Sequence, residues 1–329
     1  MELVSVVVPA FNAEKWIKPA LRSVVNQSYT NVEIVMVDDA STDNTECIAK
    51  SYLERRKCRY KYVVNAYNVG VCASRNRGVE CSSGSYILFL DCDDLLHRDC
   101  AKRLLQVLAE REDAVCAFGR SILIDEKSYI DLVQLKQRIK NKYNEAMRTY
   151  SPADVAERNP IGLGSGALVR RELLCKVEFN KKMSKRRMEG AEDWLFYFNL
   201  SLHGNLVGIE DILVGYRQHG TERISDNVIK MLESIKIFEN EVMSINAKHA
   251  TQLKKASLTS AKYLVGRVGK SGDFRLLYPL YKFTSKYGVD NAVKLTWLII
   301  SRFTKKIFIN RKNKRMVLFS DMENEYQYK

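Results

Sequence analysis

Short apolar runs that end in polar residues alternate with helical segments through the first hundred positions of the chain. The runs have the length and composition of buried parallel strands and occupy residues 5–11, 32–39, 60–65 and 86–91. Apolar residues recur at helical spacing in segments 13–28, 41–56, 71–82 and 97–110. This order predicts an α/β fold, a doubly wound and mostly parallel sheet flanked by helices.

The alternation becomes weaker beyond residue 110 and stops near residue 226. A polar stretch is expected to leave the sheet over 125–158. Further elements are expected as a strand-to-helix transition over 162–173, a helix over 192–204 and a short strand over 213–220. Helical periods alone follow, ending in a helix over 289–309. We therefore predict one domain over 1–225 and a helical C-terminal region over 226–329.

Polar side chains collect where the predicted strands end, at Asn12, Asp38, Asp39, Asn65, Asn68, Asp91, Asp93 and Asp94. In a doubly wound sheet these positions meet at the edge where ligands bind. Asp91 and Asp93 are two residues apart on an extended strand end, so their carboxylates point the same way and suit Mg²⁺ or Mn²⁺. The alternative is helix capping, by Asp93 or Asp94 for the helix over 97–110.

The turn after the first strand reads PAFNAE and carries no glycine-rich phosphate loop. A nucleotide bound here would be held by side chains and a metal ion. Asp38 or Asp39 could accept from a base N–H, and Asn12 and Arg75 could hydrogen-bond the base or ribose. The alternative for the two aspartates is capping of the helix over 41–56, where Ser41 or Thr42 is the expected N-cap.

The formal net charge of +14 calls for an anionic partner: a phosphorylated substrate, a membrane surface or a nucleic acid. No recognised nucleic-acid module is present, so nucleic acid is disfavoured. The eight cysteines form no C-x-x-C pair and are expected to be free thiols in a reducing cytosol. Glu2 stands where a signal peptide would be basic, and the apolar run over 295–301 is too short to span a bilayer.

The C-terminal region carries a basic and amphipathic segment. Eight lysines and arginines and no acidic residue lie within 291–319, accompanied by an apolar face that includes Trp297 and Phe303. Such a helix fits the edge of an anionic bilayer, whereas the alternative is a packed helix with a solvated basic face. We therefore expect a cytoplasmic protein that lies peripherally on the inner face of the cell membrane.

Five segments together resemble the family 2 glycosyltransferases of the GT-A fold, in order and in spacing. They are PAFNAE, VDDASTDNT, NVGVCASRNRGVECSSGSYILFLDCDD, GAEDW and YRQHGTERIS. The resemblance covers roughly residues 3–225, and the long composite over 68–94 is its most specific part. It implies a nucleotide-sugar donor, usually a UDP-sugar, and Mn²⁺ or Mg²⁺ at a D-x-D pair.

The resemblance also implies roles for the donor-side residues. Pro9, Ala10 and Phe11 would flank the nucleobase. Asp39 would accept a hydrogen bond from the base, with Asp38 next to Asp39.

Three further roles follow from the composite over 68–94. Arg75 would lie near the nucleotide. Asp91 would lie nearer the ribose or sugar, and Asp93 would bind the metal.

The acceptor side of the resemblance rests on GAEDW. Asp193, with Glu192 adjacent, matches the carboxylate that deprotonates the acceptor hydroxyl, and a helix N-terminus should keep it ionised. His219 would ligate the cation or contact the diphosphate, and Arg217 would neutralise diphosphate charge. For both, the alternative is an ordinary surface residue. Gly164 would bring backbone close beneath a sugar, or would serve packing alone.

The resemblance implies an inverting transferase that acts on a glycan or lipid-linked saccharide, although GT-A sheets host retention as well. One rival is a sugar nucleotidyltransferase, which would lack a role for the GAEDW base. Another is a catalytically silent scaffold that binds membranes or a partner enzyme. The donor sugar, the acceptor and the linkage depend on loops such as 125–160 and 176–190, which carry no readable motif.

Overall fold

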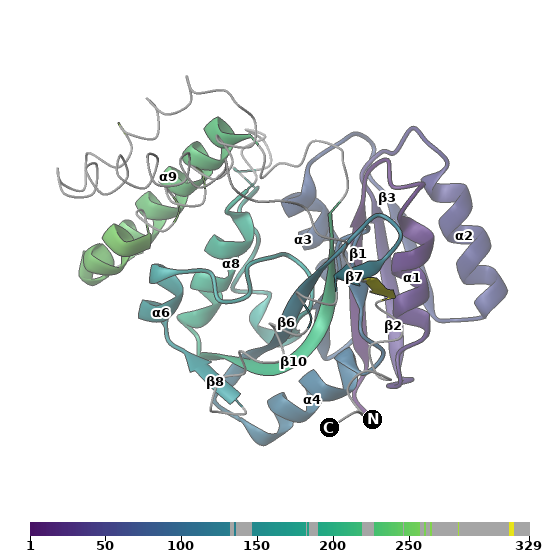
Figure 1. The fold of residues 1–329 in the computed structure, drawn as a ribbon, viewed down its shortest axis with the longest axis horizontal. Coiled ribbons are helices and arrows are strands. Elements are labelled where there is room, and N and C mark those ends of the chain that lie inside the picture. The colour runs from purple at the N-terminus through teal and green to yellow at the C-terminus, as the bar shows by residue number, and fades with distance from the viewer. Residues whose placement is uncertain are drawn as a thin grey trace.

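The computed structural model describes residues 1–131, 135, 147–181, 183, 190–218, 227–245, 247–256, 260, 264, 282 and 316–318. Its centre is a parallel sheet (Figure 1) of β1 (Val4–Ala10), β2 (Val32–Asp38), β3 (Tyr60–Val64) and β4 (Tyr86–Phe89). β1 lies between β2 and β4, and β3 is the outer strand next to β2. The four predicted strands are confirmed, and all four end at the same edge.

A second half of the sheet continues beyond β4 and is mixed in direction. It contains β9 (Ala167–Arg170), β6 (Ala114–Ile124) and β10 (Asn205–Arg217). β9 runs antiparallel to both β4 and β6, whereas β10 runs parallel to β6. Short strands extend this half, namely β5 (Leu95–Leu96), β7 (Tyr129–Asp131), β8 (Met147–Tyr150) and β11 (Met316–Leu318).

Two sequence expectations about this half were incomplete. β6 was not predicted, and β10 begins at Asn205, well before the short strand expected over 213–220. Part of the stretch 125–158 returns to the sheet as β7 and β8, because β8 pairs with β10. β10 pairs with β8 across about sixty residues of chain and with β6 across about ninety, so no local pattern indicates these pairings.

Helices cover both faces of the sheet. One face carries α1 (Ile17–Val25), α2 (Thr45–Arg56) and α4 (Cys100–Glu110), packed on the side chains of Val4, Val6 and Val8. The other carries α3 (Val71–Cys81), α6 (Pro152–Glu157) and α8 (Glu192–Ser201), packed in the cluster that includes Val7 and Phe89. Alternate residues of β1 thus serve opposite faces, as the pleat requires.

The helix starts correct two capping predictions. α2 begins at Thr45 with Asn44 in the N-cap position, so neither Ser41 nor Thr42 caps it. α4 begins at Cys100 with Asp99 in the N-cap position. The prediction that Asp94 caps that helix is therefore wrong, because β5 lies between Asp94 and the helix.

The long helix α9 (Val228–Ile245) begins just after the predicted boundary near residue 226 and packs on α8 (Figure 1). The rings of Trp194 and Phe238 stack with centroids 4.3 Å apart. The Ala191 N–H donates to Ser234 Oγ over 2.8 Å, which fixes the entry of α8 against α9. A single-turn 3-10 helix, η1 (Arg171–Leu173), follows β9, and another, η3 (Ala247–His249), follows α9.

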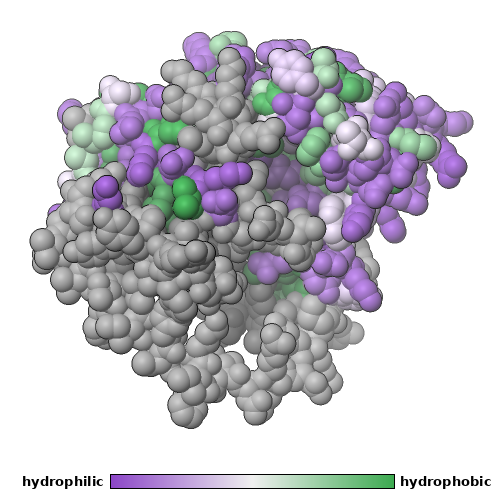
Figure 2. Space-filling model, turned by 90° about the horizontal axis from the view of Figure 1, so that it is seen from above, coloured by the Kyte–Doolittle hydropathy of each residue, from purple (hydrophilic) through white to green (hydrophobic). Residues whose placement is uncertain are grey.

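The fold can be compared with the sequence predictions about the cysteines, membrane-spanning helices and the basic segment. All eight cysteines are free, as expected. Among the helices that the structure describes, none is long and apolar enough to cross a membrane. The face shown in Figure 2 is mostly hydrophilic over its described part, with hydrophobic residues in small separate groups. The basic segment expected to form a helix over 289–309 lies outside the described residues, so membrane association stays a prediction.

Candidate active site

A cavity of about 350 Å³ opens at the carboxyl ends of β1, β2 and β4, where a doubly wound sheet is expected to bind its ligand. Many of the predicted site residues line it, namely Pro9, Ala10, Phe11, Asp39, Asn68, Arg75, Asp91, Asp93 and Glu192. Gly70, Val71, Ser74 and Cys92 complete the lining. The sequence thus places most of its candidates around one cavity, although their roles there stay predictions.

The wall formed by Pro9, Ala10 and Phe11 lies at the end of β1. Pro9 pairs in register with Val37 and Ala10 is buried, whereas the ring of Phe11 is 48% exposed just beyond the strand. An exposed aromatic ring at the rim of a polar cavity offers a flat apolar surface for a base or sugar. This arrangement suits the predicted position of these three residues beside the nucleobase.

Asp39 is buried and organises the loop before α3. Its Oδ1 accepts from Asn65 Nδ2 over 2.7 Å and from the Val69 N–H over 2.9 Å, and its Oδ2 accepts from the Gly70 N–H over 2.8 Å. A carboxylate has about four acceptor positions, so Asp39 retains capacity for one further donor. It can therefore hold the loop and still meet a base N–H.

Asp38 and Asn12 do not line the cavity, which differs from the sequence prediction. Asp38 accepts from the Ser41 N–H over 2.8 Å and from the Tyr62 hydroxyl over 2.6 Å. Asn12 Oδ1 accepts from the Thr42 N–H over 2.8 Å, and the Asn12 N–H donates to Ser41 Oγ. Asn12 therefore joins the turns after β1 and β2, whereas Asp38 joins the turn after β2 to Tyr62 of β3.

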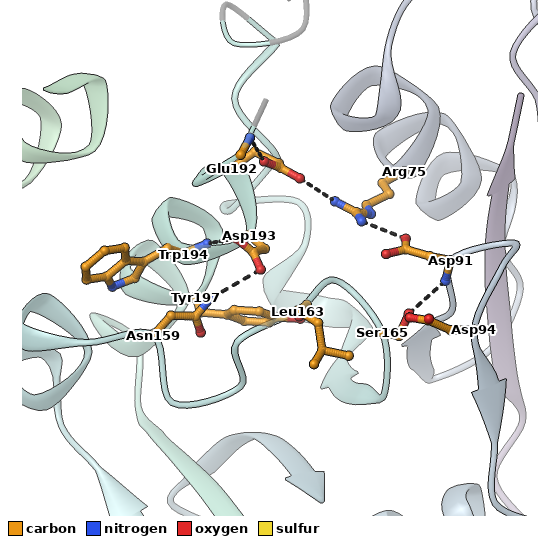
Figure 3. Close-up of polar contacts among 11 residues, drawn as sticks. Arg75, Asp91, Asp94, Asn159, Leu163, Ser165, Glu192, Asp193, Trp194 and Tyr197 are labelled. Atoms are coloured by element: carbon orange, nitrogen blue, oxygen red, sulfur yellow. Dashed lines mark hydrogen bonds and ion pairs between the residues drawn. The ribbon is translucent and has the colours of Figure 1, made fainter. Parts of the chain in front are cut away.

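Arg75 is the centre of the site (Figure 3). Its Nη2 donates to Asp91 Oδ1 over 2.7 Å, and its Nη1 lies 3.5 Å from Glu192 Oε1. The residue is only 2% exposed, and its guanidinium lies 5.0 Å from the centroid of the Phe179 ring. Burial alone would lower the pKa of Arg75, but the two carboxylates outweigh it and raise the pKa further. The arginine is thus a fixed cation that joins the end of β4 to the start of α8.

Gly164 lets the backbone approach this ion pair. A Cβ added at Gly164 would lie 2.1 Å from Arg75 Nη2 and 3.0 Å from Asp91 Oδ2. Any side chain here would therefore displace the guanidinium or the carboxylate. The structure thus gives Gly164 a packing reason, its closeness to Arg75 and Asp91, and its predicted place beneath a sugar stays a prediction.

Ser165 connects the same segment to the acidic turn. The Asp91 N–H donates to Ser165 Oγ over 2.9 Å, and the Ser165 hydroxyl donates to Asp94 Oδ2 over 2.6 Å. Asp94 also accepts from the Arg217 N–H over 3.0 Å. Burial, with the neighbouring Asp93 carboxylate, raises the pKa of Asp94 well above its ordinary value. Asp94 is therefore an internal brace of the D-x-D turn.

Arg217 lies behind this turn, and not on the cavity wall where the sequence prediction placed it. Its Nε donates to the Asp93 carbonyl over 2.7 Å, and its Nη1 donates to the Asp125 and Glu126 carbonyls. The side chain is 1% exposed and its guanidinium lies over the Trp16 ring. These hydrogen bonds hold separate backbone segments together, and the contact of Arg217 with a diphosphate stays a prediction.

Asp193 follows Glu192 in the first turn of α8, and its carboxylate is directed toward Asn159 (Figure 3). Asn159 Nδ2 donates to Asp193 Oδ2 over 3.2 Å, and the Trp194 N–H donates to Oδ1 over 2.7 Å. Burial, followed by the charge of Glu192, raises the pKa of Asp193 to about 7, although Arg75 and the Trp194 amide oppose it. The expectation that the helix start keeps this acid fully ionised is corrected, because desolvation outweighs the dipole.

Asn159 is a site residue that no sequence pattern indicated. Its Oδ1 accepts from the N–H groups of Ile161 and Gly162, over 3.1 and 3.0 Å. The amide oxygen is therefore engaged by the turn, and the NH₂ group must face Asp193. Residues 159–165, here named the linking segment, thus contact Asp193 at one end and Arg75, Asp91 and Asp94 at the other.

The acidic turn offers hard oxygen ligands for a divalent cation. Asp91 and Asp93 both line the cavity. A Cβ added at Gly164 would lie 3.0 Å from Asp91 Oδ2. No group of three or more His, Cys, Asp or Glu side chains in the described part of the chain is arranged to hold a metal ion. Two carboxylates still fit Mg²⁺ or Mn²⁺, because these ions take substrate phosphate oxygens and water as further ligands. His219, the third predicted ligand, lies outside the described residues.

Known proteins resemble this chain in sequence and in fold. The model of glycosyl transferase family 2 matches residues 5–177, more than half of the chain. The chain belongs to glycosyl transferase family 2. A family relative, an uncharacterised glycosyltransferase of Haemophilus influenzae, is 28% identical over 93% of this chain and 97% of its own length. The putative teichuronic acid biosynthesis glycosyltransferase TuaG of Bacillus subtilis is 35% identical, over 39% of this chain and 51% of its own.

Solved structures share the fold of this glycosyltransferase. S. aureus TarS, residues 1–349 in complex with UDP-GlcNAc, superposes with a TM-score of 0.62 at 19% identity and covers 92% of each chain. The mannosyltransferase PcManGT from Pyrobaculum calidifontis, in complex with GDP-Man and Mn²⁺, gives a TM-score of 0.54 at 17% identity, over 91% of this chain and 87% of its own. The predicted GT-A fold class is confirmed.

Proposed function

We propose that this glycosyltransferase moves a sugar from a UDP-sugar to a hydroxyl of a glycan or lipid-linked saccharide, with inversion in a single displacement. One observation carries the proposal: Arg75 ties Asp91, on the donor side of the cavity, to Glu192, next to the carboxylate of Asp193. The UDP-GlcNAc complex of TarS supports a UDP-sugar donor. The relative named for teichuronic acid biosynthesis supports a polysaccharide acceptor.

Asp193 is the proposed general base. Its pKa of about 7 lies close to neutral pH, where a base combines a useful ionised fraction with a strong tendency to take a proton. It would accept the proton of the acceptor hydroxyl while that oxygen forms a bond to the anomeric carbon. The bond from this carbon to the diphosphate breaks in the same step, and its electron pair leaves with the nucleotide. Attack from the face opposite the leaving group inverts the anomeric centre.

The leaving diphosphate needs charge stabilisation on the donor side. Asp91 and Asp93 are the residues that would hold Mn²⁺ or Mg²⁺, and such an ion supplies Lewis-acid stabilisation of departing phosphate oxygens. The Mn²⁺ complex of PcManGT supports a divalent cation in this role. Arg75 keeps Asp91 in place for it, through the 2.7 Å hydrogen bond.

The test is to measure nucleotide release from a panel of UDP- and GDP-sugars, with and without Mn²⁺, using the native chain and Asp193→Asn. The variant should keep its affinity for UDP in the presence of Mn²⁺ and lose about 10²–10⁴-fold in transfer rate, the usual contribution of a general base. Asp113→Asn is the matched control, since Asp113 pairs with Arg111 and neither residue lines the cavity.

Two results would contradict the proposal. Near-native turnover of Asp193→Asn would remove the base assignment. Pyrophosphate release from a nucleoside triphosphate and a sugar phosphate would indicate a nucleotidyltransferase instead. Proton NMR of the product's anomeric signal distinguishes inversion from retention.

A further inference from the structure

One buried side chain of α3, that of Asn76, holds a segment of chain that lies 103 residues further on. Its Nδ2 donates to the Phe179 carbonyl over 2.9 Å, and its Oδ1 accepts from the Phe179 N–H over 2.9 Å. Both residues are buried, with 5% and 1% of their surface exposed. The backbone N–H can only donate, so the orientation of the amide group is fixed. Asn76 thus satisfies both backbone polar groups of Phe179.

Phe179 needs such a partner because its own backbone is irregular. Residues 177–180 lie between η1 and α8, and these four residues belong to no helix or strand. A buried N–H or C=O group without a partner costs free energy, and a helix or strand would normally supply the partner. The Asn76 side chain supplies it here, so α3 sets the position of Phe179.

The ring of Phe179 lies in a buried aromatic cluster. It stacks on Phe196 of α8, with centroids 4.0 Å apart and an interplanar angle of 6°. It also packs against Phe89 of β4, with centroids 5.3 Å apart and an interplanar angle of 85°. A ring that is packed closely against both a helix and a strand has little room to turn. The Phe179 ring is therefore a fixed surface.

The guanidinium of Arg75 lies 5.0 Å from the centroid of this ring. It has one hydrogen bond, from Nη2 to Asp91, and within the described part of the chain neither Nε nor Nη1 has a hydrogen-bond partner. Glu192 lies 3.5 Å from Nη1 and supplies charge without a directed bond. A single hydrogen bond leaves the plane of a guanidinium undetermined. Contact with the ring of Phe179 fixes that plane, because guanidinium groups pack on aromatic faces.

We propose that Asn76 is a positioning residue of the donor site. It holds Phe179, and the Phe179 ring orients the Arg75 guanidinium toward Asp91 and the nucleotide. Asn76 does not line the donor cavity itself, so it acts through these contacts alone. The inference rests on the proposed function, because affinity for UDP is one of its measures.

Calorimetric titration of the full chain with UDP and Mn²⁺ tests this role. Asn76→Ala should weaken UDP binding about tenfold, because small displacements of a positioned group are costly. Gln27→Ala is the matched control. Gln27 is also buried, and its amide donates to the His97 carbonyl over 2.8 Å and accepts from the Ala101 N–H over 3.0 Å. None of these three residues lines the donor cavity.

The control separates positioning from stability. Both variants lose a buried amide that binds backbone, so both should lower the melting temperature. Only Asn76→Ala should change the affinity for UDP. Native affinity in Asn76→Ala, or an equal loss in Gln27→Ala, would overturn the proposal.

Phe179→Leu tests whether Asn76 acts through the ring. This variant keeps the backbone groups that Asn76 binds and removes the aromatic face, so it should weaken UDP binding by a similar factor. The double variant should lose little more than the larger single loss, because coupled substitutions are not additive. A double loss equal to the product of the two single losses would overturn the proposal. If Asn76→Ala does not fold, native affinity in Phe179→Leu would overturn it as well.

A measurement without ligand separates this inference from the proposed function. The Nε–H group of a buried arginine gives a signal in a proton–nitrogen correlation NMR spectrum, and Arg75→Lys identifies the signal of Arg75. Asn76→Ala should shift this signal, because the nearby ring moves, whereas Gln27→Ala should not. If the native chain binds no UDP, the proposed donor fails and the NMR comparison still decides the role of Asn76. An unmoved Arg75 signal in Asn76→Ala would overturn that role.

Discussion

Arg75 occupies a position where a single side chain must satisfy two carboxylates from distant parts of the chain. Asp91 follows β4, and Glu192 begins α8 more than a hundred residues later. A buried guanidinium is tolerated because both acids compensate its charge, and Phe179 covers one face of the guanidinium. Removing the cation would leave two acids facing each other with no positive charge between them.

We therefore predict that Arg75→Gln lowers the free energy of unfolding by about 3–5 kcal/mol, the usual cost of breaking a buried ion pair. Urea denaturation followed by circular dichroism measures the change. Lys50→Gln is the control, since the Lys50–Glu46 pair lies on the surface of α2 and should contribute little. A similar loss in both variants would show that burial of Arg75 has no special effect.

Asp193 should give the reaction a pH dependence. Because its pKa is raised to about 7, the carboxylate form that can act as a base increases as pH rises through 7. We predict that kcat/KM falls about tenfold for each pH unit below this point and levels off above it. Initial rates from about pH 5 to 9 measure the profile.

A substitution at Asn159 provides a second test of this pH profile. Its amide donates to the ionised form of Asp193, so Asn159→Ala should shift the midpoint to higher pH. A flat profile in the native chain, or an unchanged midpoint in the variant, would contradict the assignment. Binding of UDP should be unaffected by the substitution.

At the scale of elements, the linking segment decides how the two halves of the site meet. It connects α6 to β9, and it contacts Asp193 through Asn159 and the acidic turn through Ser165. Gly164 sets its distance from Arg75. The segment thus sets the position of the donor side relative to Asp193, because it contacts both directly.

Gly164→Ala should displace the Arg75 guanidinium, because the new Cβ would lie 2.1 Å from Nη2. We predict at least about a tenfold loss of UDP affinity in the presence of Mn²⁺, equal to about 1.4 kcal/mol. Isothermal titration calorimetry measures it.

The matched variant is Gly162→Ala in the same segment. No atom lies within 4 Å of the added Cβ there, but φ is +77°, so the cost is conformational and about 1 kcal/mol of stability. It should leave UDP affinity unchanged. Equal losses of UDP affinity in both variants would indicate a general disturbance of the segment.

At the scale of the whole molecule, α9 shares a hydrophobic cluster with the sheet. Phe238 and Val242 belong to the same cluster as Val7 of β1 and Phe89 of β4. Phe238 stacks on Trp194, and Trp194 follows Asp193 directly. α9 therefore supports the helix that carries the proposed base.

Phe238→Ala should destabilise the protein by about 3–5 kcal/mol, the range for truncating a buried aromatic side chain. Because Trp194 packs on Phe238, its fluorescence should change in the same transition that circular dichroism reports. Differential scanning calorimetry provides the comparison. A separate early transition for Trp194 would show instead that α9 and α8 unfold independently of the sheet.

Local patterns in the sequence are enough to predict the parallel core and the edge of the sheet where the site lies. Strand and helix periods are local properties, and parallel strands that share a sheet must end at the same edge. Asp39, Asp91 and Asp93 could therefore be placed around one cavity from their positions at strand ends, whereas Pro9 was placed there by the family resemblance. The resemblance of GAEDW likewise selected Glu192 and Asp193 without knowledge of their surroundings.

The contacts that several of these side chains make can be known only from the folded chain. Asp94 and Arg217 are 123 residues apart, and their contact turns both inward as braces of the acidic turn. Asn159 reaches Asp193 across 34 residues. Burial, which depends on every packed neighbour, raises the pKa of Asp193 against the effect of its helix. Charge state and partner choice depend on contacts between distant segments, and a local pattern contains no record of those contacts.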